Sequence, residues 1–189
     1  MRVVVELDRK ILKDVEKRLG EFHKKAPNAI SSALNRAATN VNSNVKKEIR
    51  NKYVIKAGDI TKYGNLVKTN ASRGKLSAVV KSSGGVLPLD KFKVSPKTVN
   101  PRRKSPIKIG VKKDGLKQVM GAFVADVSGV KVFKRTGKDR LPIQRLFGPS
   151  VPQMLGNEDV KDVIEKQGQE TFQKRLDQNI KNILEKGRG

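Results

Sequence analysis

The chain has 189 residues, of which 36% are hydrophobic and 4% aromatic, so it has the size of one domain with a modest core. Its 42 Lys and Arg outnumber its 18 Asp and Glu and leave a formal charge of +24. This surplus is too large to be balanced internally, and it indicates a polyanionic partner or an acidic protein surface. A merely solvated basic surface is the alternative, but self-repulsion at this charge is costly.

Missing residue types exclude several classes of function. There is no cysteine, so disulfides, thiolate metal sites and a cysteine nucleophile are excluded. The single histidine, His23, has no serine-bearing turn beside it, so a catalytic triad and a tetrahedral zinc site both lack their residues. Gly84-Gly85 is not followed by the lysine and helix of a phosphate-binding loop. We therefore expect no enzyme, no cofactor and no metal.

Four aspartates are possible metal ligands, since a two-metal nuclease uses such side chains. They lie mostly in turns, which is the ordinary place for aspartate: Asp59, Asp90, Asp114 and Asp126. No apolar run of about 18 residues occurs, and the start MRVVVELDRK lacks the apolar region of a signal peptide. We expect a soluble protein made in the cytoplasm, without membrane contact.

Two helices are predicted near the start of the chain. Residues 1–7 alternate weakly and predict a short strand with Val3, Val5 and Leu7 on one side. A first helix is expected from Asp8, which is placed to cap it. Its apolar residues recur at helical spacing: Ile11, Leu12, Val15, Leu19 and Phe22. His23 lies near its end and is expected to have a structural or surface role.

A second helix is predicted from Pro27 to about Lys52, since proline suits a first helical turn. Its apolar stripe has small residues in the first half, which allow close approach to a helix or sheet: Ile30, Ala33, Leu34, Ala37, Ala38, Val41, Val45 and Ile49. Such a stripe usually forms intramolecular core, and a subunit interface is the alternative.

Strands dominate the middle of the chain. A β-rich triplet starts at Tyr53, and Asp59 is expected to cap a short helical turn that begins at Ile60. Alternating runs then predict a hairpin at 66–71 and 76–82, an edge segment from Val86 to Val94, and a strand at 107–111. Two further strands at 123–127 and 130–133 flank Ser128-Gly129, which suits a tight hairpin.

One exposed loop interrupts these strands. The stretch at about 95–106 contains SPKTVNPRRKS, with two prolines, several basic residues and one apolar side chain, so it cannot bury enough surface to order itself. We expect a mobile arm that becomes fixed on a partner. Arg102, Arg103 and Lys104 are its candidate contacts to DNA or to an acidic partner.

The final part of the chain predicts a rigid segment and a helix. Arg140–Pro152 reads RLPIQRLFGPSVP, whose three prolines make a regular helix or central strand unfavourable. Its apolar content indicates an extended segment fixed to a core or a partner, with Leu146 and Phe147 as anchors. The candidate docking residues are Arg140, Leu141, Pro142, Ile143, Arg145, Leu146, Phe147, Pro149 and Pro152.

A last helix is expected after Asn157, which can cap it, with Glu158 and Asp159 in its first turn. Its predicted stripe is Val160, Val163, Ile164, Phe172, Leu176, Ile180, Ile183 and Leu184. The predicted fold class is therefore α+β, with an antiparallel sheet or small sandwich flanked by a long N-terminal helix pair and a C-terminal helix. We expect one domain over 1–189.

Several of these segments, in this order, resemble the minor tail protein Z family of tailed bacteriophages and prophages. The segments are ALNRAATNV in the second helix, YVIKAGDI after it, VLPLDKF in the middle, and FKRTGKDR followed by LPIQRLFGPSVP. They span about Ala33 to Pro152. The first and last thirty residues match only in being helical.

The resemblance implies a structural virion protein that acts in tail completion and head-tail joining at the neck, made in the cytoplasm of the bacterial host. It implies docking on the tail terminator and the end of the tail tube, contact with head-tail connector proteins, and contact with genomic DNA as a secondary role. By analogy with tail symmetry we expect a homo-oligomeric ring, a hexamer. The family has no catalytic signature to transfer.

A free, basic, non-sequence-specific nucleic-acid-binding protein is the alternative. The net charge is the only feature of the sequence that supports this alternative. Proteins that stack bases combine basic grooves with aromatic platforms, and this chain has two tyrosines and no tryptophan. Tight DNA binding that survives physiological salt would favour this alternative.

Overall fold

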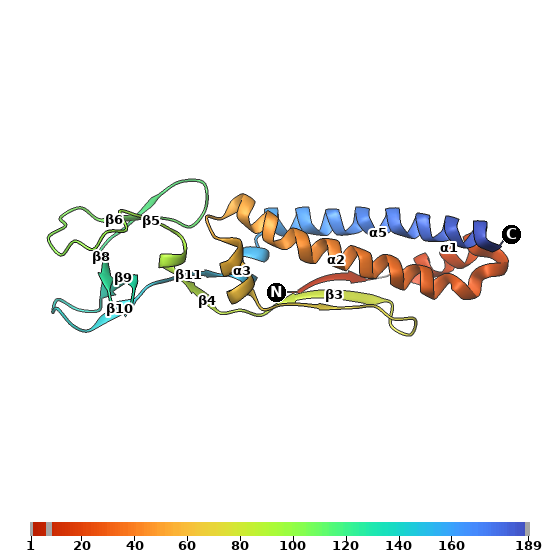
Figure 1. The fold of residues 1–189 in the computed structure, drawn as a ribbon, viewed down its shortest axis with the longest axis horizontal. Helices are drawn as coiled ribbons and strands as arrows, with labels where there is room; N and C mark the ends of the chain where they lie inside the picture. The colour runs from red at the N-terminus through yellow and green to blue at the C-terminus, as the bar shows by residue number, and fades with distance from the viewer. Residues whose placement is uncertain (1, 7–8, 188–189) are drawn as a thin grey trace. The chain divides into compact units, whose positions relative to one another are not determined.

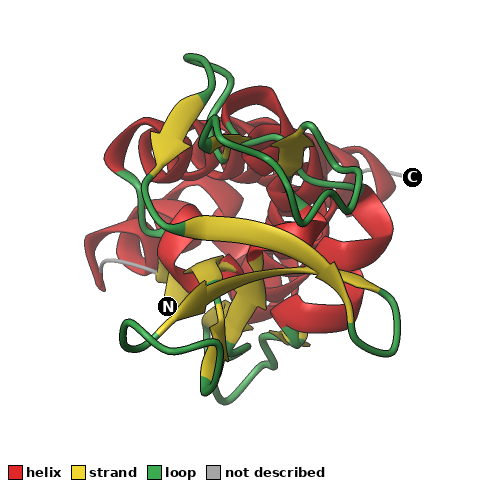
Figure 2. Cartoon of the chain, turned by 90° about the vertical axis from the view of Figure 1, so that its left-hand side faces the viewer, coloured by secondary structure: helices red, strands yellow, loops and turns green. Residues whose placement is uncertain are grey.

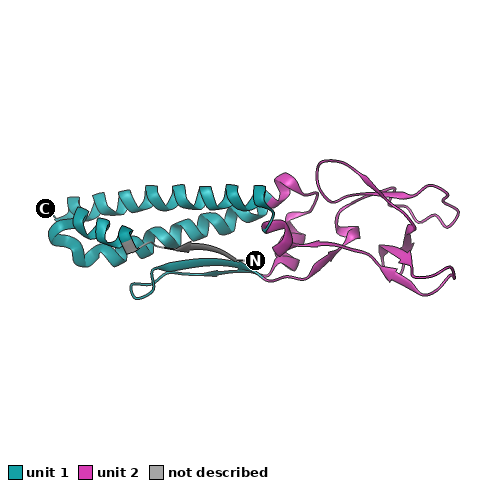
Figure 3. Ribbon diagram, turned by 180° about the vertical axis from the view of Figure 1, so that it is seen from behind, with its two compact units in different colours: residues 1–48, 66–82, 156–189 teal, residues 49–65, 83–155 magenta. Residues whose placement is uncertain are grey.

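The fold was obtained as a computed structural model, which describes residues 2–6 and 9–187. The residue contacts divide the chain into two compact units (Figure 3). Unit 1 contains residues 1–48, 66–82 and 156–189, and unit 2 contains residues 49–65 and 83–155. The expectation that the whole chain acts as one domain stays a prediction.

Unit 1 consists of helices and one small sheet (Figure 1). The helical elements are α1 (Arg9–Leu19), the 3-10 helix η1 (Gly20–Lys25), α2 (Ala26–Lys52) and α5 (Glu158–Gly187). The last four residues of α2, from Ile49 on, belong to unit 2. The first helix ends three residues before Phe22, because Gly20 has a φ of +54° and the chain continues as a 3-10 helix. His23 is exposed in η1, as expected, with its Nδ1 3.1 Å from the carbonyl oxygen of Gly20.

The predicted stripe of α2 is the best-defined core of the chain. All eight residues, from Ile30 to Ile49, have no exposed surface. The stripe combines small and large side chains, and the small ones let neighbouring elements pack closely against the helix. The stripe is therefore intramolecular, as the usual reading of such a pattern holds.

Helices α2 and α5 lie side by side and antiparallel within unit 1 (Figure 1). A side chain at Gly168 of α5 would lie 2.8 Å from Val41 Cγ2, so glycine is what lets the helices approach there. Amides hold the pair at other points: Asn44 donates to Gln167 Oε1 at 2.7 Å, and Asn179 donates to the carbonyl of Ala29 at 2.9 Å.

The beginning of α5 differs from the prediction in one respect. Glu158 and Asp159 occupy its first turn, as expected. The backbone carbonyl of Asn157 accepts bonds from the N–H groups of Val160 and Lys161, but its Oδ1 has no hydrogen-bond partner among the described residues. The prediction of an Asn157 side-chain cap was wrong. Most of the predicted stripe is buried, whereas Val163 is 41% exposed.

The sheet of unit 1 has the order β1-β3-β2 and is antiparallel. Its strands are β1 (Arg2–Glu6), β2 (Leu66–Thr69) and β3 (Ser77–Ser82). The predicted hairpin is confirmed, and so is the N-terminal strand. The facing of Val3, Val5 and Leu7 and the cap at Asp8 lie outside the described residues or side chains. Asn35 of α2 ties to the hairpin loop through two bonds with the backbone of Ala71, at 2.7 and 3.0 Å.

Unit 2 is built from short strands joined by long loops, which Figure 2 separates by colour. Its helical elements are α3 (Ala57–Gly64), the 3-10 helix η2 (Leu89–Lys91) and α4 (Val151–Leu155). Its strands are β4 (Val86–Pro88), β5 (Lys93–Ser95), β6 (Ile107–Gly110), β7 (Lys117–Val119), β8 (Ala122–Asp126), β9 (Val130–Arg135), β10 (Ile143–Arg145) and β11 (Phe147–Ser150).

These strands form three antiparallel sheets, with the orders β10-β9-β8, β11-β4 and β5-β6-β7. The hairpin around Ser128-Gly129 is confirmed, and both residues have a positive φ, of 51° and 100°. The α+β class is confirmed. Among the described residues, the strands are three to six residues long and form four small sheets.

The short helix of unit 2 begins earlier than predicted. α3 starts at Ala57, its N-cap residue is Lys56, and Asp59 lies in the first turn, so the prediction of an Asp59 cap was wrong. The backbone N–H groups of Asp59 and Ile60 bond to the carbonyl of Lys56 and set this earlier start.

Burial raises the pKa of the Tyr53 phenol above its ordinary value, because Tyr53 is 5% exposed.

Within the described part of the chain, no helix combines the length and the apolar character needed to cross a bilayer.

Candidate docking segment

The predicted segment Arg140–Pro152 is extended over most of its length. Strand β10 pairs with β9, and β11 pairs with β4 through a register shift between Gly148 and Ser150. The Leu141–Pro142 peptide bond is cis. The segment thus lies within unit 2 mainly as two short strands. The prediction of an ordered extended segment is confirmed over this part.

Backbone hydrogen bonds fix the segment where the two strands meet. The N–H of Leu146 donates to the carbonyl of Val132 at 2.9 Å, and the carbonyl of Leu146 accepts from Leu89 at 3.0 Å. Near its start, the carbonyl of Pro142 accepts from the N–H and the hydroxyl of Thr136, at 3.3 and 3.1 Å. The conformation of the segment is therefore determined by unit 2.

An ion pair adds to this fixation. Arg145 Nη2 lies 2.9 Å from Asp90 Oδ1, and both side chains are largely removed from solvent. Asp90 belongs to η2, so the pair ties β10 to the turn that follows β4. Partial burial strengthens the Coulomb attraction between the two charges, and the cost of desolvating them offsets part of this gain.

Gly148 lets the strand approach the core closely. A side chain at this position would lie 2.8 Å from Phe92 Cε2 and 3.1 Å from Leu89 Cδ2. Two apolar side chains of the unit 2 core therefore occupy the space that a residue other than glycine would need.

Burial within the chain shows which residues of the segment are fixed to its core. Phe147 is 51% exposed and Leu146 is only partly buried, whereas Val151 has no exposed surface and packs against Gly64. Phe147 was predicted to anchor the segment to a core or to a partner; it is not buried in the core of this chain, and contact with a partner stays a prediction. The reason for its exposure is its place on β11, opposite Pro88, with the Arg145 guanidinium 5.9 Å from its ring.

The end of the segment is helical, which the prolines were expected to prevent. Pro152 is the second residue of α4, where a missing N–H costs nothing. Ser150 precedes the helix, and its hydroxyl accepts from the N–H of Gln153 at 3.2 Å. This serine cap is the signal that sequence reasoning missed.

Several side chains of the segment are exposed to solvent. Leu141 is 67% exposed and Phe147 is 51% exposed, and Arg140 and Pro142 are also exposed. Val86 of the paired strand β4 is a further apolar residue, 53% exposed, that the prediction did not include. The exposed apolar side chains are therefore carried on a fixed backbone.

The basic loop is separate from this segment in sequence. Residues 96–106 form a loop, as predicted, that has exposed side chains at Arg102 and Lys104. Arg103 is partly buried, because its guanidinium turns back to the carbonyl and hydroxyl of Thr98, at 3.3 and 3.1 Å. Arg102 and Lys104 are thus the two cations of this trio that are available to a partner.

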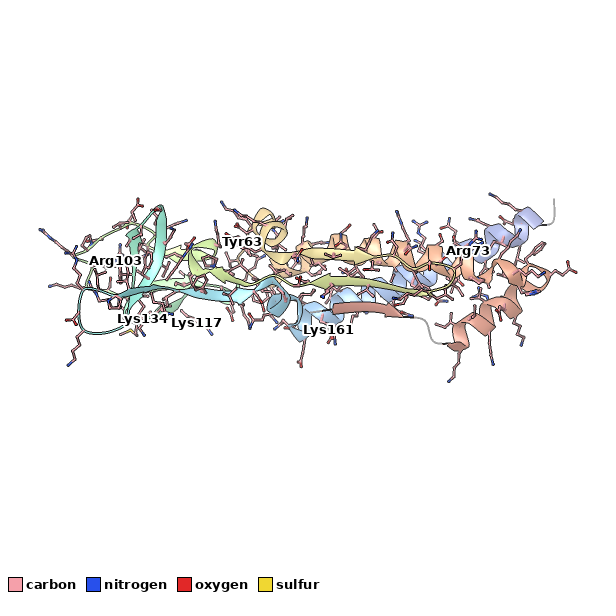
Figure 4. All side chains as sticks on the ribbon, turned by 90° about the horizontal axis from the view of Figure 1, so that it is seen from below. Tyr63, Arg73, Arg103, Lys117, Lys134 and Lys161 are labelled. Atoms are coloured by element: carbon pink, nitrogen blue, oxygen red, sulfur yellow. The ribbon has the colours of Figure 1, made fainter. Side chains whose placement is uncertain are left out.

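Unit 2 contains most of the net positive charge, +15 of +24. Its 90 residues include 20 of the 42 Lys and Arg and only 5 of the 18 Asp and Glu. Figure 4 shows such side chains extending from the ribbon, among them Arg103, Lys117 and Lys134. An acidic surface would therefore be attracted more strongly to unit 2 than to unit 1.

The exposed side chains of the segment and of unit 2 can make apolar and ionic contacts. Among residues 2–6 and 9–187, no group of three or more His, Cys, Asp or Glu is placed to hold a metal ion. Phe147, Leu141 and Val86 offer apolar contact, and the lysines and arginines of unit 2 offer charge.

Comparison with known protein families identifies the family of the chain. The model of the family described as prophage minor tail protein Z (GPZ) matches residues 10–186, which include both units. No curated protein and no solved structure shows significant similarity to the chain. Over nearly its whole length, the chain belongs to the prophage minor tail protein Z family, and it is a structural component of the phage tail.

Proposed function

We propose that this tail protein completes the tail at its head-proximal end and takes part in joining the head at the neck. The single observation that supports this function most is the Arg140–Pro152 segment, which carries Leu141 and Phe147 exposed on a backbone fixed by hydrogen bonds. The partner is the tail terminator with the end of the tail tube. Head-tail connector proteins are the neighbours on the other side.

A fixed segment binds with little loss of conformational entropy. The two strands, the Arg145–Asp90 pair and the buried Val151 already hold it in place in the free chain. Burying an aromatic ring and a leucine then contributes to affinity without an ordering cost, which is what preorganisation achieves. The charge of unit 2 adds attraction and orientation more than affinity.

The test is binding to tails. Tails assembled without this protein are incubated with the purified chain, and co-sedimentation is measured for the wild type and for a Leu141→Ala/Phe147→Ala variant. We expect the variant to bind at least about tenfold more weakly, because centrally buried aromatic residues dominate interfaces. Met120→Ala is the matched control, because Met120 is 69% exposed and lies outside the segment.

The results discriminate. The proposal is supported if the wild type and the control bind to tails and restore joining to heads, whereas the double variant loses both binding and joining. Equal binding by all three proteins would show that the segment is not the docking surface.

DNA contact is a second candidate, favoured by one observation, the exposure of Arg102 and Lys104 on a loop within the more basic unit. It predicts an affinity for duplex DNA that falls steeply with salt, in proportion to the phosphates neutralised. Arg102→Ala/Lys104→Ala should reduce that slope by about two. An unchanged slope would exclude the loop as the DNA contact.

A further inference from the structure

A second basic surface lies in unit 1 and shares no residue with the docking segment. Helices α2 and α5 border two hollows, of about 460 Å³ and 280 Å³. We refer to the two hollows together as the helix seam. The first contains Arg36, Lys174 and Arg175, and the second contains Lys25 and Lys186.

The two hollows lie on one continuous face. On α2 the lining residues Asn28, Ser32, Arg36 and Ser43 follow one another at intervals of four, four and seven, which places them on the same side of a helix. From Asn28 to Ser43 the face is about 22 Å long at 1.5 Å per residue. A peptide of about seven residues covers that distance when it is extended.

The seam is lined by five cations and by no carboxylate. Lys68 of β2 adds a sixth nearby positive charge, because its Nζ lies 2.9 Å from Thr39 Oγ1 in the first hollow. Concave surfaces of one charge focus their potential and attract the opposite charge. Carboxylates or phosphates are therefore the groups that this seam attracts.

The hydroxyl groups of the first hollow distinguish between these two. Thr39, Ser43 and Thr171 each give the hydroxyl hydrogen to a backbone carbonyl one turn earlier, at 2.8, 3.0 and 2.8 Å. Thr39 Oγ1 also accepts from Lys68 Nζ, whereas the hydroxyl oxygens of Ser43 and Thr171 each have lone pairs that can accept a hydrogen bond from a ligand. A phosphodiester has no donor for them, whereas a peptide backbone N–H has one.

The second hollow points to the same ligand. Between its two lysines, the lining includes the amides of Asn28 and Asn182 and the apolar side chains of Ala29 and Ile183. Amides bind both the N–H and the C=O of a peptide, and Ile183 offers apolar contact to a side chain. A phosphodiester backbone can accept from the amide N–H groups, but it has no N–H to donate to the amide oxygens and no apolar side chain to place against Ile183.

We propose that the helix seam binds an acidic peptide segment of a partner protein, with glutamate or aspartate side chains on the cations of both hollows and backbone N–H groups on the hydroxyl oxygens. This site lies outside the docking segment, and it does not depend on the proposed function of that segment.

The probe is a fluorescein-labelled synthetic peptide of about eight residues in which Glu alternates with Leu and Ser, a length that matches the seam. Fluorescence anisotropy measures its affinity for the full chain at ~150 mM salt, where long-range attraction is screened. The seam variant is Arg36→Glu/Lys174→Glu. The control is Lys117→Glu/Lys134→Glu, an equal charge change at exposed positions of unit 2.

We expect the seam variant to bind the peptide at least about tenfold more weakly, and the control to lose less than about twofold. An equal loss in the two variants would mean that the peptide reads only net charge, and this would overturn the proposal. Thermal unfolding of each variant verifies that the fold is retained, which we expect since all four side chains are exposed.

A hydroxyl variant separates a peptide site from a phosphate site. Thr171→Val keeps the shape of the side chain and removes its oxygen, so the peptide should bind several-fold more weakly while a labelled single-stranded oligonucleotide keeps its affinity. If the oligonucleotide loses affinity in the seam variant and the peptide does not, the seam is a phosphodiester site and the proposal is wrong.

Discussion

Gly84 is the residue at which a single methyl group should be most disruptive. A Cβ at this position would overlap the carbonyl oxygen of Tyr63, and a backbone atom cannot move aside as a side chain can. Gly85, the next residue, has open space around its Cβ position.

We therefore predict that Gly84→Ala lowers the free energy of unfolding by about 2–3 kcal/mol, the range for overpacking at a site that cannot relax. Gly85→Ala should stay within about 0.5 kcal/mol of the wild type, as surface changes do. Urea unfolding measures both. Similar values for the two variants would show that the backbone of Tyr63 does yield.

Phe147 and Met154 should separate docking from folding. Met154 has no exposed surface, so Met154→Ala should cost about 2–5 kcal/mol of stability. Phe147 is half exposed, so Phe147→Ala should cost less than about 1 kcal/mol in the isolated chain. Its effect should appear in binding to tails. A large loss of stability in Phe147→Ala would mean that the ring serves the fold.

At the scale of elements, the approach of α2 and α5 depends on Gly168. Gly168→Leu should destabilise the chain by about 1–3 kcal/mol, because the new side chain meets Val41 in a packed interface. Adding Val41→Ala should restore part of the loss, and this coupling is the signature of direct contact. The control is Gln169→Leu, at an exposed position one residue along. Additive effects of the two changes would contradict the contact.

The basic loop gives a second prediction at this scale. Its residues are mostly exposed and bury little apolar surface, so trypsin should cleave the isolated chain first near Arg102, Arg103 or Lys104. In the assembled particle the same bonds should be protected. Mass spectrometry of the fragments follows both cases. Equal protection before and after assembly would contradict a loop that a partner fixes.

The elements also show how far sequence reasoning reaches. The α2 stripe and the Ser128-Gly129 hairpin follow from local periodicity and turn chemistry, and both are confirmed. Pairing between β4 and β11 joins residues about sixty positions apart, and no local pattern encodes it. The exposure of Phe147 follows from that pairing. The Arg145–Asp90 pair was missed for the same reason.

The helix seam was beyond reach of the sequence too. Arg36 and Arg175 are ordinary helix-surface residues until the antiparallel packing of α2 and α5 brings them to one hollow. The hydroxyl pattern of Thr39 and Thr171 is visible in the sequence as residues on a helix, but the direction of their hydrogen bonds is not.

At the scale of the whole molecule, we expect the charge of +24 to control assembly. We propose that the chain forms a homo-oligomeric ring, a hexamer that matches the symmetry of the tail, and that the ring forms on an acidic template. Free subunits repel one another, and salt or a template weakens this repulsion. Sedimentation velocity should therefore show a monomer or weak oligomer in dilute solution at low salt. A stable ring under those conditions, without any template, would refute this mechanism.

The position of the protein in the particle is the most direct test of the proposed role. Electron cryomicroscopy of intact tails, compared with tails from a mutant that lacks the chain, locates the density that belongs to it. We predict a ring at the head-proximal end of the tail, with the Arg140–Pro152 segment against the terminator or the tube end. Density distributed along the tube, or a particle that joins heads normally without the chain, would contradict the account.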